Sequence, residues 1–467
     1  MEKFEYVILG QGSAAFAAAI RANELGIKTV MMGKNETKGA LLGGTCVNVG
    51  CVPSKRLLSV SKWLYDLKAK RFDGVNYDIK KIKYDTILEG KDDLVSAFRV
   101  KKYKEVLESL ENVTYMKEFG SFENSNTIKV GNREIEAEKV LIATGARANI
   151  PNIKGIEKID YLTNEEALSL KELPESLIVI GGRAMGLEFA QLFSRLGVKV
   201  TLLQRSNTIL PEYEPEISML LHKYLTEEGV EIKTNISLSS ISQYKGVKRI
   251  EVADKNIFEA EQVLFATGRR ANIEKLNYEH IGLKLEKNFI LVNEFMKTSA
   301  NGVYAAGDVT GEPMLETLAA KEGSVATVNA FTKAKATINK NEIPKAIFTD
   351  PEVATVGLTD AEAHGKGLKC ACNVLPFSLV PKASIINDTK GAIKIVIDYK
   401  THKILGVHII APNAADLIHE GVLAVKFGLT IDDIIDTVHV FPTLSEGIKL
   451  AAQSFYKDVS KMSCCTE

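Results

Sequence analysis

Runs of hydrophobic residues that end in glycine recur along the chain and predict strands that lead into tight turns. The segment FEYVILGQGSAAFAAAIRANELGIKTVMM (4–32) has the pattern of a strand, a turn, a helix and a second strand. The segment SLIVIGGRAMGLEFAQLFSRLGVKVTLLQRS (176–206) repeats this pattern, and apolar residues recur on one face of its helix at Phe189, Phe193 and Leu196. Two such units predict an α/β fold built on parallel sheets.

Each unit is followed by a similar closing stretch. The segments VLIATGARANI (140–150) and VLFATGRRANI (263–273) are both hydrophobic strands that end in Ala-Thr-Gly. A third strand, in NGVYAAGDVTG (301–311), ends at Asp308, on the carboxyl edge where the ligands of parallel sheets bind. The Asp308 carboxylate either accepts hydrogen bonds from a ribityl hydroxyl or caps a turn. Two dinucleotide sites in one chain indicate electron transfer between two cofactors, as in a flavoenzyme.

The first unit carries a glycine pattern that indicates dinucleotide binding. Gly10 permits a tight turn, Gly12 lets the backbone approach a pyrophosphate, and Ala15 is the small residue that packs the helix on the sheet. The pyrophosphate would lie at the helix N-terminus, where free N–H groups and the helix dipole favour an anion. We therefore predict a cofactor site at Gly10, Gly12, Ala14 and Ala15.

The second unit keeps only part of this pattern. Gly181 and Gly186 are in place, but Arg183 occupies the position of the second glycine. At the end of the following strand, Gln204 stands where an acidic residue would bind a ribose 2′-hydroxyl, and Arg205 comes next. An arginine at this position accommodates a 2′-phosphate, which favours NADPH over NADH. The alternative is that Arg205 is an ordinary surface residue.

Composition excludes several classes of protein. The chain has 467 residues, enough for about three domains. It carries 59 Lys and Arg against 59 Asp and Glu, so no net charge draws it to nucleic acid or to an anionic membrane. No apolar run reaches the ~18 residues of a membrane span. Six cysteines are too few for a secreted disulfide scaffold, so we expect a cytoplasmic protein.

The most reactive segment predicted by the sequence is GGTCVNVGCVPSK (43–55). Pro53 and Ser54 follow Cys51 and signal the start of a helix. A thiol at a helix N-terminus near Lys55 should have a lowered pKa, which gives a thiolate ready to attack or to bind metal. The alternative is a pair of buried structural cysteines. A zinc site is disfavoured, because Cys46 and Cys51 lack a second ligand pair at finger spacing.

Taken together, the cysteine segment, the first glycine pattern, the two Ala-Thr-Gly stretches and the Gly-Asp strand resemble the flavin-dependent pyridine nucleotide–disulfide oxidoreductases. The resemblance extends over essentially the whole chain. It implies FAD on the first unit and NADPH on the second. It also implies that Cys46 and Cys51 form a redox-active pair, with Cys51 nearest the flavin and Cys46 exchanging with substrate.

The same resemblance assigns further residues. Lys55 would lie near the flavin N5 and pair with Glu188. Other implied cofactor contacts are Gly44, Thr45, Gly120, Thr144, Gly145, Gly268, Asp308 and Glu316. The implied fold is α/β, with two Rossmann-like dinucleotide-binding domains and a C-terminal α+β dimerisation domain. The predicted domains are residues 1–150 and 271–337 for FAD, 151–270 for NADPH, and 338–467 for dimerisation with a Cys-Cys tail.

The segment VHVFPTLSEG (438–447) departs from the disulfide reductases of this family. They have a catalytic histidine where Phe441 stands here, and a glutamate that orients it, which corresponds to Glu446. A phenyl ring cannot carry a proton. His439 either substitutes for the missing base or is a structural histidine. The ordinary chemistry of dihydrolipoamide or glutathione enzymes is therefore disfavoured.

The end of the chain resembles the mercuric ion reductases. The segment EGIKLAAQSFYKDVSKMSCCTE (446–467) places Cys464 and Cys465 side by side. Adjacent Cα atoms lie about 3.8 Å apart, whereas a relaxed disulfide needs roughly 4.4–6.8 Å, so we expect two free thiols. Hg(II) is a soft cation that prefers thiolates. The resemblance implies that these thiols capture Hg(II) from small-thiol complexes and deliver it to Cys46 and Cys51 of the partner subunit in a homodimer.

Several features differ from that family or leave its details open. Phe441 stands where a tyrosine is common, Glu316 and Thr317 replace apolar and aromatic residues, and Met32 replaces an acidic ribose ligand. No metal-binding module is expected ahead of residue 4. Cys370 and Cys372 share one face of a predicted strand, either as a third metal site or as packing residues. Two alternatives to a mercury(II) reductase remain. One is a disulfide reductase such as a dihydrolipoamide dehydrogenase, and the other is a flavoprotein that binds soft metals without reducing them.

Overall fold

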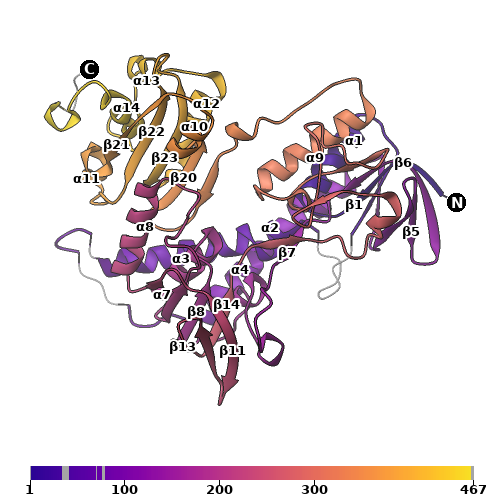
Figure 1. Cartoon of the computed structure of the whole chain (residues 1–467), viewed down its shortest axis with the longest axis horizontal. Helices are drawn as coiled ribbons and strands as arrows, with labels where there is room; N and C mark the ends of the chain where they lie inside the picture. Colours follow the sequence, from indigo (N-terminus) through magenta and orange to yellow (C-terminus); the bar gives the residue numbers. More distant parts are fainter. Residues whose placement is uncertain (1, 34–41, 70, 76–78, 464–467) are drawn as a thin grey trace.

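A computed structural model describes residues 2–33, 42–69, 71–75 and 79–463 (Figure 1). A mixed sheet that is parallel at its centre, a parallel sheet and an antiparallel sheet form the main cores, and helices pack against them. The predicted α/β class with a separate C-terminal α+β unit is therefore confirmed. No helix among the described residues is both long enough and apolar enough to cross a bilayer.

The first sheet has the strand order β3-β2-β1-β6-β5-β4, and β18 pairs with β6. Its parallel part consists of β3, β2, β1, β6 and β18, whereas β4 and β5 pair antiparallel. The bounds are β1 (Glu2–Leu9), β2 (Thr29–Met32), β3 (Val113–Met116), β4 (Gly120–Asn124), β5 (Thr127–Val130), β6 (Arg133–Ile142) and β18 (Val303–Ala305). Strand β1 is buried on both faces, which explains its unbroken hydrophobic run.

Helices α1 (Ser13–Glu24) and α9 (Glu316–Phe331) lie side by side on one face of this sheet (Figure 1). They pack closely because Gly323 has no side chain: a Cβ there would meet the Ala14 carbonyl oxygen at 2.1 Å. Segments about 300 residues apart in sequence therefore build one layer. This is the arrangement expected if residues 271–337 return to the first domain, although the predicted boundaries themselves remain a prediction.

The second parallel sheet has the order β10-β9-β8-β14. Its strands are β8 (Ser176–Ile180), β9 (Lys199–Leu203), β10 (Glu231–Lys233) and β14 (Gln262–Phe265). Helices α7 (Ala184–Arg195) and α8 (Pro215–Glu227) belong to this unit. A smaller antiparallel sheet consists of β11 (Leu238–Tyr244), β12 (Val247–Val252) and β13 (Ile257–Ala260).

The third sheet is antiparallel, with the order β19-β20-β23-β22-β21. Its strands are β19 (Lys345–Ile347), β20 (Glu352–Gly357), β21 (Cys370–Pro376), β22 (Ala392–Asp398) and β23 (Ile404–Ala411). The accompanying helices are α10 (Asp360–Gly365), α11 (Pro381–Ile385), α12 (Ala414–Phe427), α13 (Ile431–Asp436) and α14 (Glu446–Gln453). Helix α12 packs on β20 and β23 and closes one face of this sheet.

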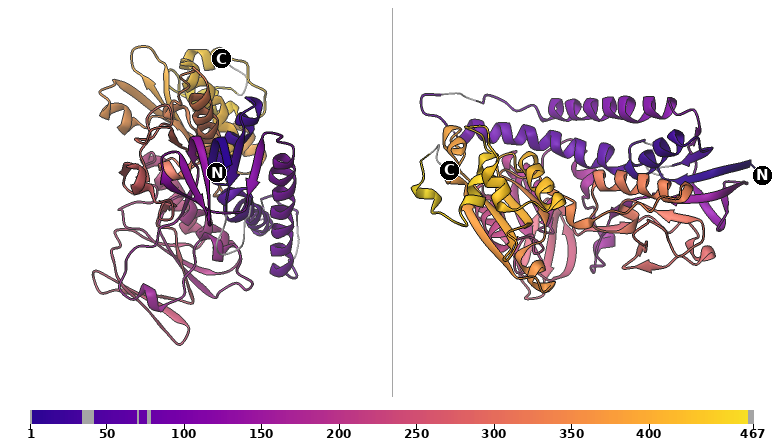
Figure 2. Two further views of the ribbon diagram at one scale, coloured as in Figure 1. Left: turned by 90° about the vertical axis from the view of Figure 1, so that its right-hand side faces the viewer. Right: turned by 90° about the horizontal axis from the view of Figure 1, so that it is seen from above.

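Two long helices, α3 (Cys51–Ala69) and α4 (Tyr84–Arg99), run side by side along the molecule (Figure 2). Helix α3 starts at the first sheet and ends against the other two units. Its Lys62 Nζ lies 2.8 Å from Asp350 Oδ1, and the Arg195 guanidinium lies 4.1 Å from the centroid of the Tyr65 ring. Helix α3, which begins with Cys51, is therefore fixed by contacts with both of the other units.

Candidate active site

The two cysteines of the 43–55 segment lie on consecutive helices. Cys46 is in α2 (Gly44–Val49), and Cys51 is the first residue of α3. Gly50 makes the sharp connection, since a Cβ there would meet the Thr45 carbonyl oxygen at 2.8 Å. The structure records both cysteines as free thiols that hydrogen bond to each other. It thus brings together the pair that the sequence predicted.

The two thiols have opposite tendencies to ionise. The pKa of Cys51 lies below its usual value because the Cys46 thiol donates a hydrogen bond to it and Lys55 adds positive charge. The pKa of Cys46 is raised, because its proton is held in that hydrogen bond and because the thiol is partly buried. Of the two thiols, Cys51 therefore loses its proton more readily, and Cys46 keeps its proton more strongly.

A partly buried ion pair lies one helical turn beyond Cys51. Lys55 Nζ is 2.8 Å from Glu188 Oε2, and the other Glu188 oxygen accepts a hydrogen bond of 2.9 Å from the Phe348 backbone N–H. The Lys55 ammonium also lies 4.6 Å from the centroid of the Phe348 ring. The pairing implied by the resemblance is thus present, and it joins the cysteine segment to α7 of the second unit.

Three polar residues that sequence reasoning missed hold this segment in place. The Asn48 amide donates to the carbonyl oxygens of Leu42 and Gly44 at 2.9 and 2.8 Å, and Arg99 Nε donates to Asn48 Oδ1 at 2.9 Å. The Asn164 amide donates to the Val49 carbonyl at 2.6 Å. The only available signal was Asn48 itself, which lies between the two cysteines.

The first glycine turn has the geometry that a pyrophosphate requires. Gly10 has φ +148°, and a Cβ there would meet the Ala143 carbonyl oxygen at 2.1 Å. A Cβ at Gly12 would meet only Gly44 Cα, at 3.6 Å, so space is left beside the backbone. The N-terminus of α1 has no side-chain cap, which leaves its N–H groups for a ligand. Ala14 and Ala15 are buried in the layer beneath.

Arg269 is a further residue that the sequence reasoning passed over. It follows Gly268 and reaches toward the first unit, where its guanidinium donates to Thr45 Oγ1 at 3.3 Å and lies 3.7 Å from Asp308. Its Nε is buried and has no hydrogen-bond partner among the described residues. Burial raises the pKa of Asp308 and lowers that of Arg269. An orphaned donor beside Asp308 and Thr45 fits a polar ligand such as a dinucleotide.

Glu316 lies at the N-terminus of α9, opposite the cysteine pair. Ser13 Oγ donates to Glu316 Oε1 at 3.1 Å, and the Tyr103 hydroxyl is hydrogen bonded to Ser13. Burial raises the pKa of Tyr103 to about 12, so it remains a phenol at neutral pH. The Glu316 carboxylate raises the pKa of both cysteines and opposes the effect of Lys55. Helices α1, α2, α3 and α9 therefore converge on one site.

The second glycine turn is packed in the same way as the first. A Cβ at Gly186 would meet the Gly181 carbonyl oxygen at 1.9 Å, so the helix fits against the turn only without a side chain there. Gln204 is buried, and its Oε1 accepts from the Gly182 N–H at 3.0 Å. Arg205 is exposed and has no hydrogen bond or ion pair with another described residue. The Arg205 side chain is therefore available to a ligand.

The remaining predicted backbone positions fall into two groups. Thr144, Gly145 and Gly268 lie where the closing stretches β7 (Ala146–Ala148) and β15 (Arg269–Ala271) pair with each other. Gly120 is the first residue of β4, and a Cβ there would meet the side chains of Leu9 and Ile128 at 2.8 Å. The structure thus supplies a packing reason for glycine at 120.

The C-terminal residues do not form a proton-transfer pair. Phe441 is 48 % exposed. One buried oxygen of Glu446 has no hydrogen-bond partner among the described residues, and burial raises the pKa of that carboxyl. His439 Nε2 is 2.9 Å from Glu420 Oε1, and its Nδ1 is 3.0 Å from the Thr437 carbonyl oxygen. Both nitrogens of His439 are occupied. Cys464 and Cys465 lie outside the described residues.

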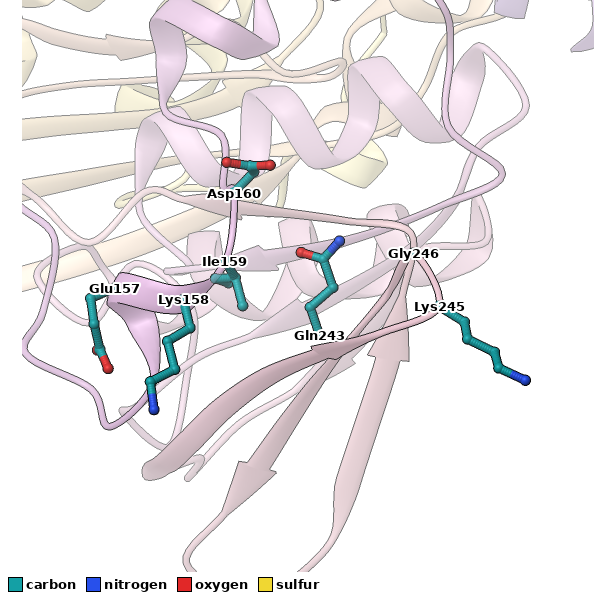
Figure 3. Close-up of a pocket in the computed structure, with 7 residues that line it drawn as sticks. All are labelled: Glu157, Lys158, Ile159, Asp160, Gln243, Lys245 and Gly246. Carbon is teal, nitrogen blue, oxygen red and sulfur yellow. The ribbon is translucent and has the colours of Figure 1, made fainter.

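A surface hollow of about 600 Å³ lies elsewhere, between the 156–158 turn and the β11–β12 hairpin (Figure 3). Glu157, Lys158 and Lys245 extend from it into solvent (Figure 3). None of the predicted site residues lines it.

Comparisons with known proteins identify the family of the chain. The family model "Pyridine nucleotide-disulphide oxidoreductase" matches residues 4–323, and its dimerisation domain matches residues 343–452. The chain belongs to this family of oxidoreductases, which implies FAD and a nicotinamide dinucleotide as cofactors. The dimerisation domain indicates a homodimer.

Within this family, the chain is similar to mercuric reductases from several bacteria. The chain is 40% identical to mercuric reductase from Lysinibacillus sphaericus, over 99% of the chain and 85% of that protein. It is 41% identical to that of Staphylococcus aureus, over 99% of the chain and 84% of that protein. Among solved structures, the Cu(II) complex of the flavoprotein disulfide reductase RclA from Escherichia coli has a TM-score of 0.88 at 26% identity, covering 98% of this chain and all of that one.

Proposed function

We propose that this protein is an NADPH-dependent, FAD-containing enzyme that reduces Hg(II) to Hg(0). The observation that carries the proposal is a reactive thiol pair that has no acid–base residue beside it to transfer a proton to a leaving thiol. Cys51 is poised as a thiolate, but residue 441 is Phe, and both His439 nitrogens are hydrogen bonded within the C-terminal unit. Reduction of an organic disulfide needs a proton donor for the leaving thiol, whereas a metal ion bound to thiolates does not. The mercuric reductase relatives support this choice of substrate.

The residues of the chain would divide the chemistry between them. Gly10, Gly12 and the free N–H groups of α1 would hold the FAD pyrophosphate, and Asp308 with Arg269 would bind its polar linker. When bound, FAD would relay two electrons from the nicotinamide to the metal site. Lys55, held by Glu188, would keep the Cys51 region positive, which stabilises the thiolate that takes up Hg(II).

Mercury would arrive as a complex with small thiols. Cys464 and Cys465 would take it by ligand exchange and pass it to Cys46 and Cys51 of the partner subunit, each exchange releasing one thiol and forming one Hg–S bond. Two electrons from one NADPH reduce Hg(II) to Hg(0), and both Hg–S bonds break so that the thiolates are regenerated. A shared site of this kind rests on the homodimer that the dimerisation domain indicates.

Preference for NADPH would come from Arg205. Its side chain is exposed and has no described partner, while the neighbouring Gln204 is used internally to bind the Gly182 N–H. Arginine forms strong charge-assisted bonds to phosphate. A 2′-phosphate bound beside the end of β9 would form such bonds with the Arg205 guanidinium.

The test measures NADPH oxidation by the purified, FAD-loaded protein on addition of Hg(II) with excess small thiol, with Hg(0) trapped as vapour. A variant with alanine at both 464 and 465 is run in parallel. We expect NADPH consumed in equal amount to Hg(0) by the wild type, and a large loss of activity in the variant at limiting Hg(II)-thiol complex.

The same preparation is assayed with lipoamide and with glutathione disulfide. Turnover of either disulfide that exceeds Hg(II)-dependent turnover would overturn the proposal in favour of a disulfide reductase. Stoichiometric uptake of mercury without Hg(II)-dependent NADPH oxidation would instead identify a metal-binding flavoprotein.

A further inference from the structure

A second cluster of metal-binding side chains lies in the C-terminal unit, outside the site described above. Asp360 and His364 are one turn apart on α10, and Cys370 begins the edge strand β21. One ligand atom from each lies within 4.8 Å of the other two. The three side chains offer oxygen, nitrogen and sulfur, a combination typical of zinc and other borderline divalent ions.

The separations between these atoms match those around a tetrahedral ion. Cys370 Sγ is 3.3 Å from Asp360 Oδ1 and 3.4 Å from His364 Nδ1, and Nδ1 is 3.3 Å from Asp360 Oδ1. Ligands at about 2.0–2.3 Å from a tetrahedral zinc lie roughly 3.3–3.8 Å from one another. An ion can therefore enter with little movement of the three atoms. The ring would exchange its present bond to the Asp360 carbonyl for the ion.

The backbone around the cluster is fixed before any ion binds. Thr359 and Glu362 form a capping box at the start of α10. The helix ends in a Schellman turn, in which the Gly367 N–H bonds to the His364 carbonyl at 2.8 Å and the Leu368 N–H to the Ala363 carbonyl at 3.0 Å. Gly367 has φ +74°, which turns the chain back so that Cys370 faces the helix.

A buried charge network anchors the first ligand. The Asp360 backbone N–H donates to Glu214 Oε1 at 2.7 Å, and Glu214 Oε2 is 2.8 Å from Lys394 Nζ. Glu214 and Lys394 are 2% and 3% exposed, so this contact lies in the packed interface between α8 and the third sheet. A site whose ligands are held in this way loses less conformational entropy on binding than a flexible one.

We propose that Asp360, His364 and Cys370 form a second metal site, which binds a zinc-type divalent cation with a water in the fourth position. The ion would join α10 to the open edge of the third sheet. The site is independent of mercury reduction, because its ligands belong neither to the cysteine pair nor to the predicted tail. Cys372 lies two residues along the same strand and is exposed, but it is not one of the three ligands.

Zinc protection of one thiol tests the proposal directly. Reduced, FAD-loaded full-length protein is alkylated with iodoacetamide, with and without zinc chloride, and the rate at each cysteine is followed by mass spectrometry of peptides. We expect zinc to slow alkylation of Cys370 by about tenfold or more, because the thiolate is both the metal ligand and the nucleophile, and a thiolate bound to zinc is not free to attack iodoacetamide. Cys372 serves as the internal reference, because it is exposed and belongs neither to the proposed site nor to the thiol pairs assigned to mercury.

Two variants and two controls decide the outcome. His364→Ala and Asp360→Asn should abolish or weaken the protection of Cys370. The His364 side chain is 63% exposed, so removal of its ring should not disturb folding. His280→Ala, at another exposed histidine, should leave protection intact, as should Cys372→Ser. Zinc counted after dialysis should fall by up to one ion per chain in His364→Ala and in Asp360→Asn, and should stay at the wild-type amount in His280→Ala and Cys372→Ser.

Equal alkylation of Cys370 with and without zinc would overturn the proposal. Protection that survives His364→Ala but disappears in Cys372→Ser would also overturn it, because the ion would then be held by a pair of thiols rather than by the three proposed ligands.

Discussion

The two dinucleotide-binding units are built alike and differ where they meet solvent. A Cβ at Gly10 or at Gly181 would meet the carbonyl oxygen of Ala143 or Ala266, at 2.1 and 2.3 Å. Their closing stretches also hydrogen bond to each other in the same way in both directions. Thr144 Oγ1 donates to the Asn272 carbonyl at 2.7 Å, and Thr267 Oγ1 donates to the Asn149 carbonyl at 2.6 Å. Both units therefore use the same turn and the same strand ending.

The second glycine position distinguishes them. In the first unit, Gly12 is covered by Gly44 of the chain's own α2, the helix that carries Cys46. In the second unit, the corresponding Arg183 is 52% exposed and pairs with Glu212 and Glu312 at the surface. An enclosed turn suits a cofactor that stays bound beside the thiols, whereas an open turn suits a cofactor that enters and leaves in each catalytic cycle. The same scaffold can therefore suit a cofactor that stays bound or one that is exchanged, depending on which residues lie beside the glycine turn.

The largest effect is expected from a substitution that removes the thiol chemistry of the first unit and leaves nucleotide binding by the second unit intact. Cys51→Ser should reduce Hg(II)-dependent turnover by about 10³-fold or more, since removal of a reacting group costs at least that much. NADPH should still bleach the flavin absorbance, because the second unit is untouched. Stopped-flow absorbance and Hg(0) trapping measure the two properties. Loss of both together would show that the units are not separable in this way.

A matched pair of substitutions tests whether the first glycine turn encloses its cofactor more tightly than the second. Gly12→Ala adds a Cβ that meets only Gly44 Cα, at 3.6 Å, so the fold should be kept. The methyl group would instead crowd a bound pyrophosphate, and overpacking of about 1–3 kcal/mol corresponds to roughly 5–150-fold weaker FAD binding. Arg183→Ala removes only exposed ion pairs, each worth about 0–1 kcal/mol. It should leave the flavin content unchanged. Flavin absorbance per chain after gel filtration measures both.

Arg205→Ala should affect the second unit only. Loss of a charge-assisted bond to phosphate costs about 1.5–3 kcal/mol, or roughly 10–150-fold in KM for NADPH. KM for NADH should hardly change, because NADH lacks the 2′-phosphate. Steady-state kinetics with both nucleotides give the ratio. An equal loss for the two nucleotides would mean that Arg205 does not read the phosphate.

Much of this architecture could be predicted from the sequence, because hydrophobic strands, glycine turns and the Cys46–Cys51 spacing are local signals. The Lys55–Glu188 pair came from family resemblance and not from pattern. The anchoring by Asn164 and the entry of Arg269 into the first unit depend on contacts over more than 100 residues, which no local pattern records. The sequence offered Cys370 as a possible metal ligand, but it grouped Cys370 with Cys372 and not with Asp360 and His364. The helix that carries Asp360 and His364 is only six residues long, and the three ligands become neighbours through the turn at Gly367.

The smallest predicted effect concerns how the first unit sets the charge of its thiols. The pKa of Cys51 is lowered first by the hydrogen bond from Cys46 and then by Lys55. Its thiolate therefore persists at lower pH than that of an ordinary cysteine, and removal of either cause should shift the pH profile of alkylation to higher pH. We expect the larger shift in Cys46→Ala and the smaller in Lys55→Met.

The matched control for Lys55→Met is Arg56→Met, which removes a positive charge from the next, exposed residue of α3. Rates of iodoacetamide labelling at Cys51 between about pH 5 and 9 bracket the ordinary cysteine pKa of about 8.5. Arg56→Met should keep the wild-type profile, because an exposed charge is screened by solvent. If Arg56→Met and Lys55→Met shift the profile equally, the thiolate is stabilised by the general charge of the helix and not by the Lys55 ammonium that Glu188 holds in place.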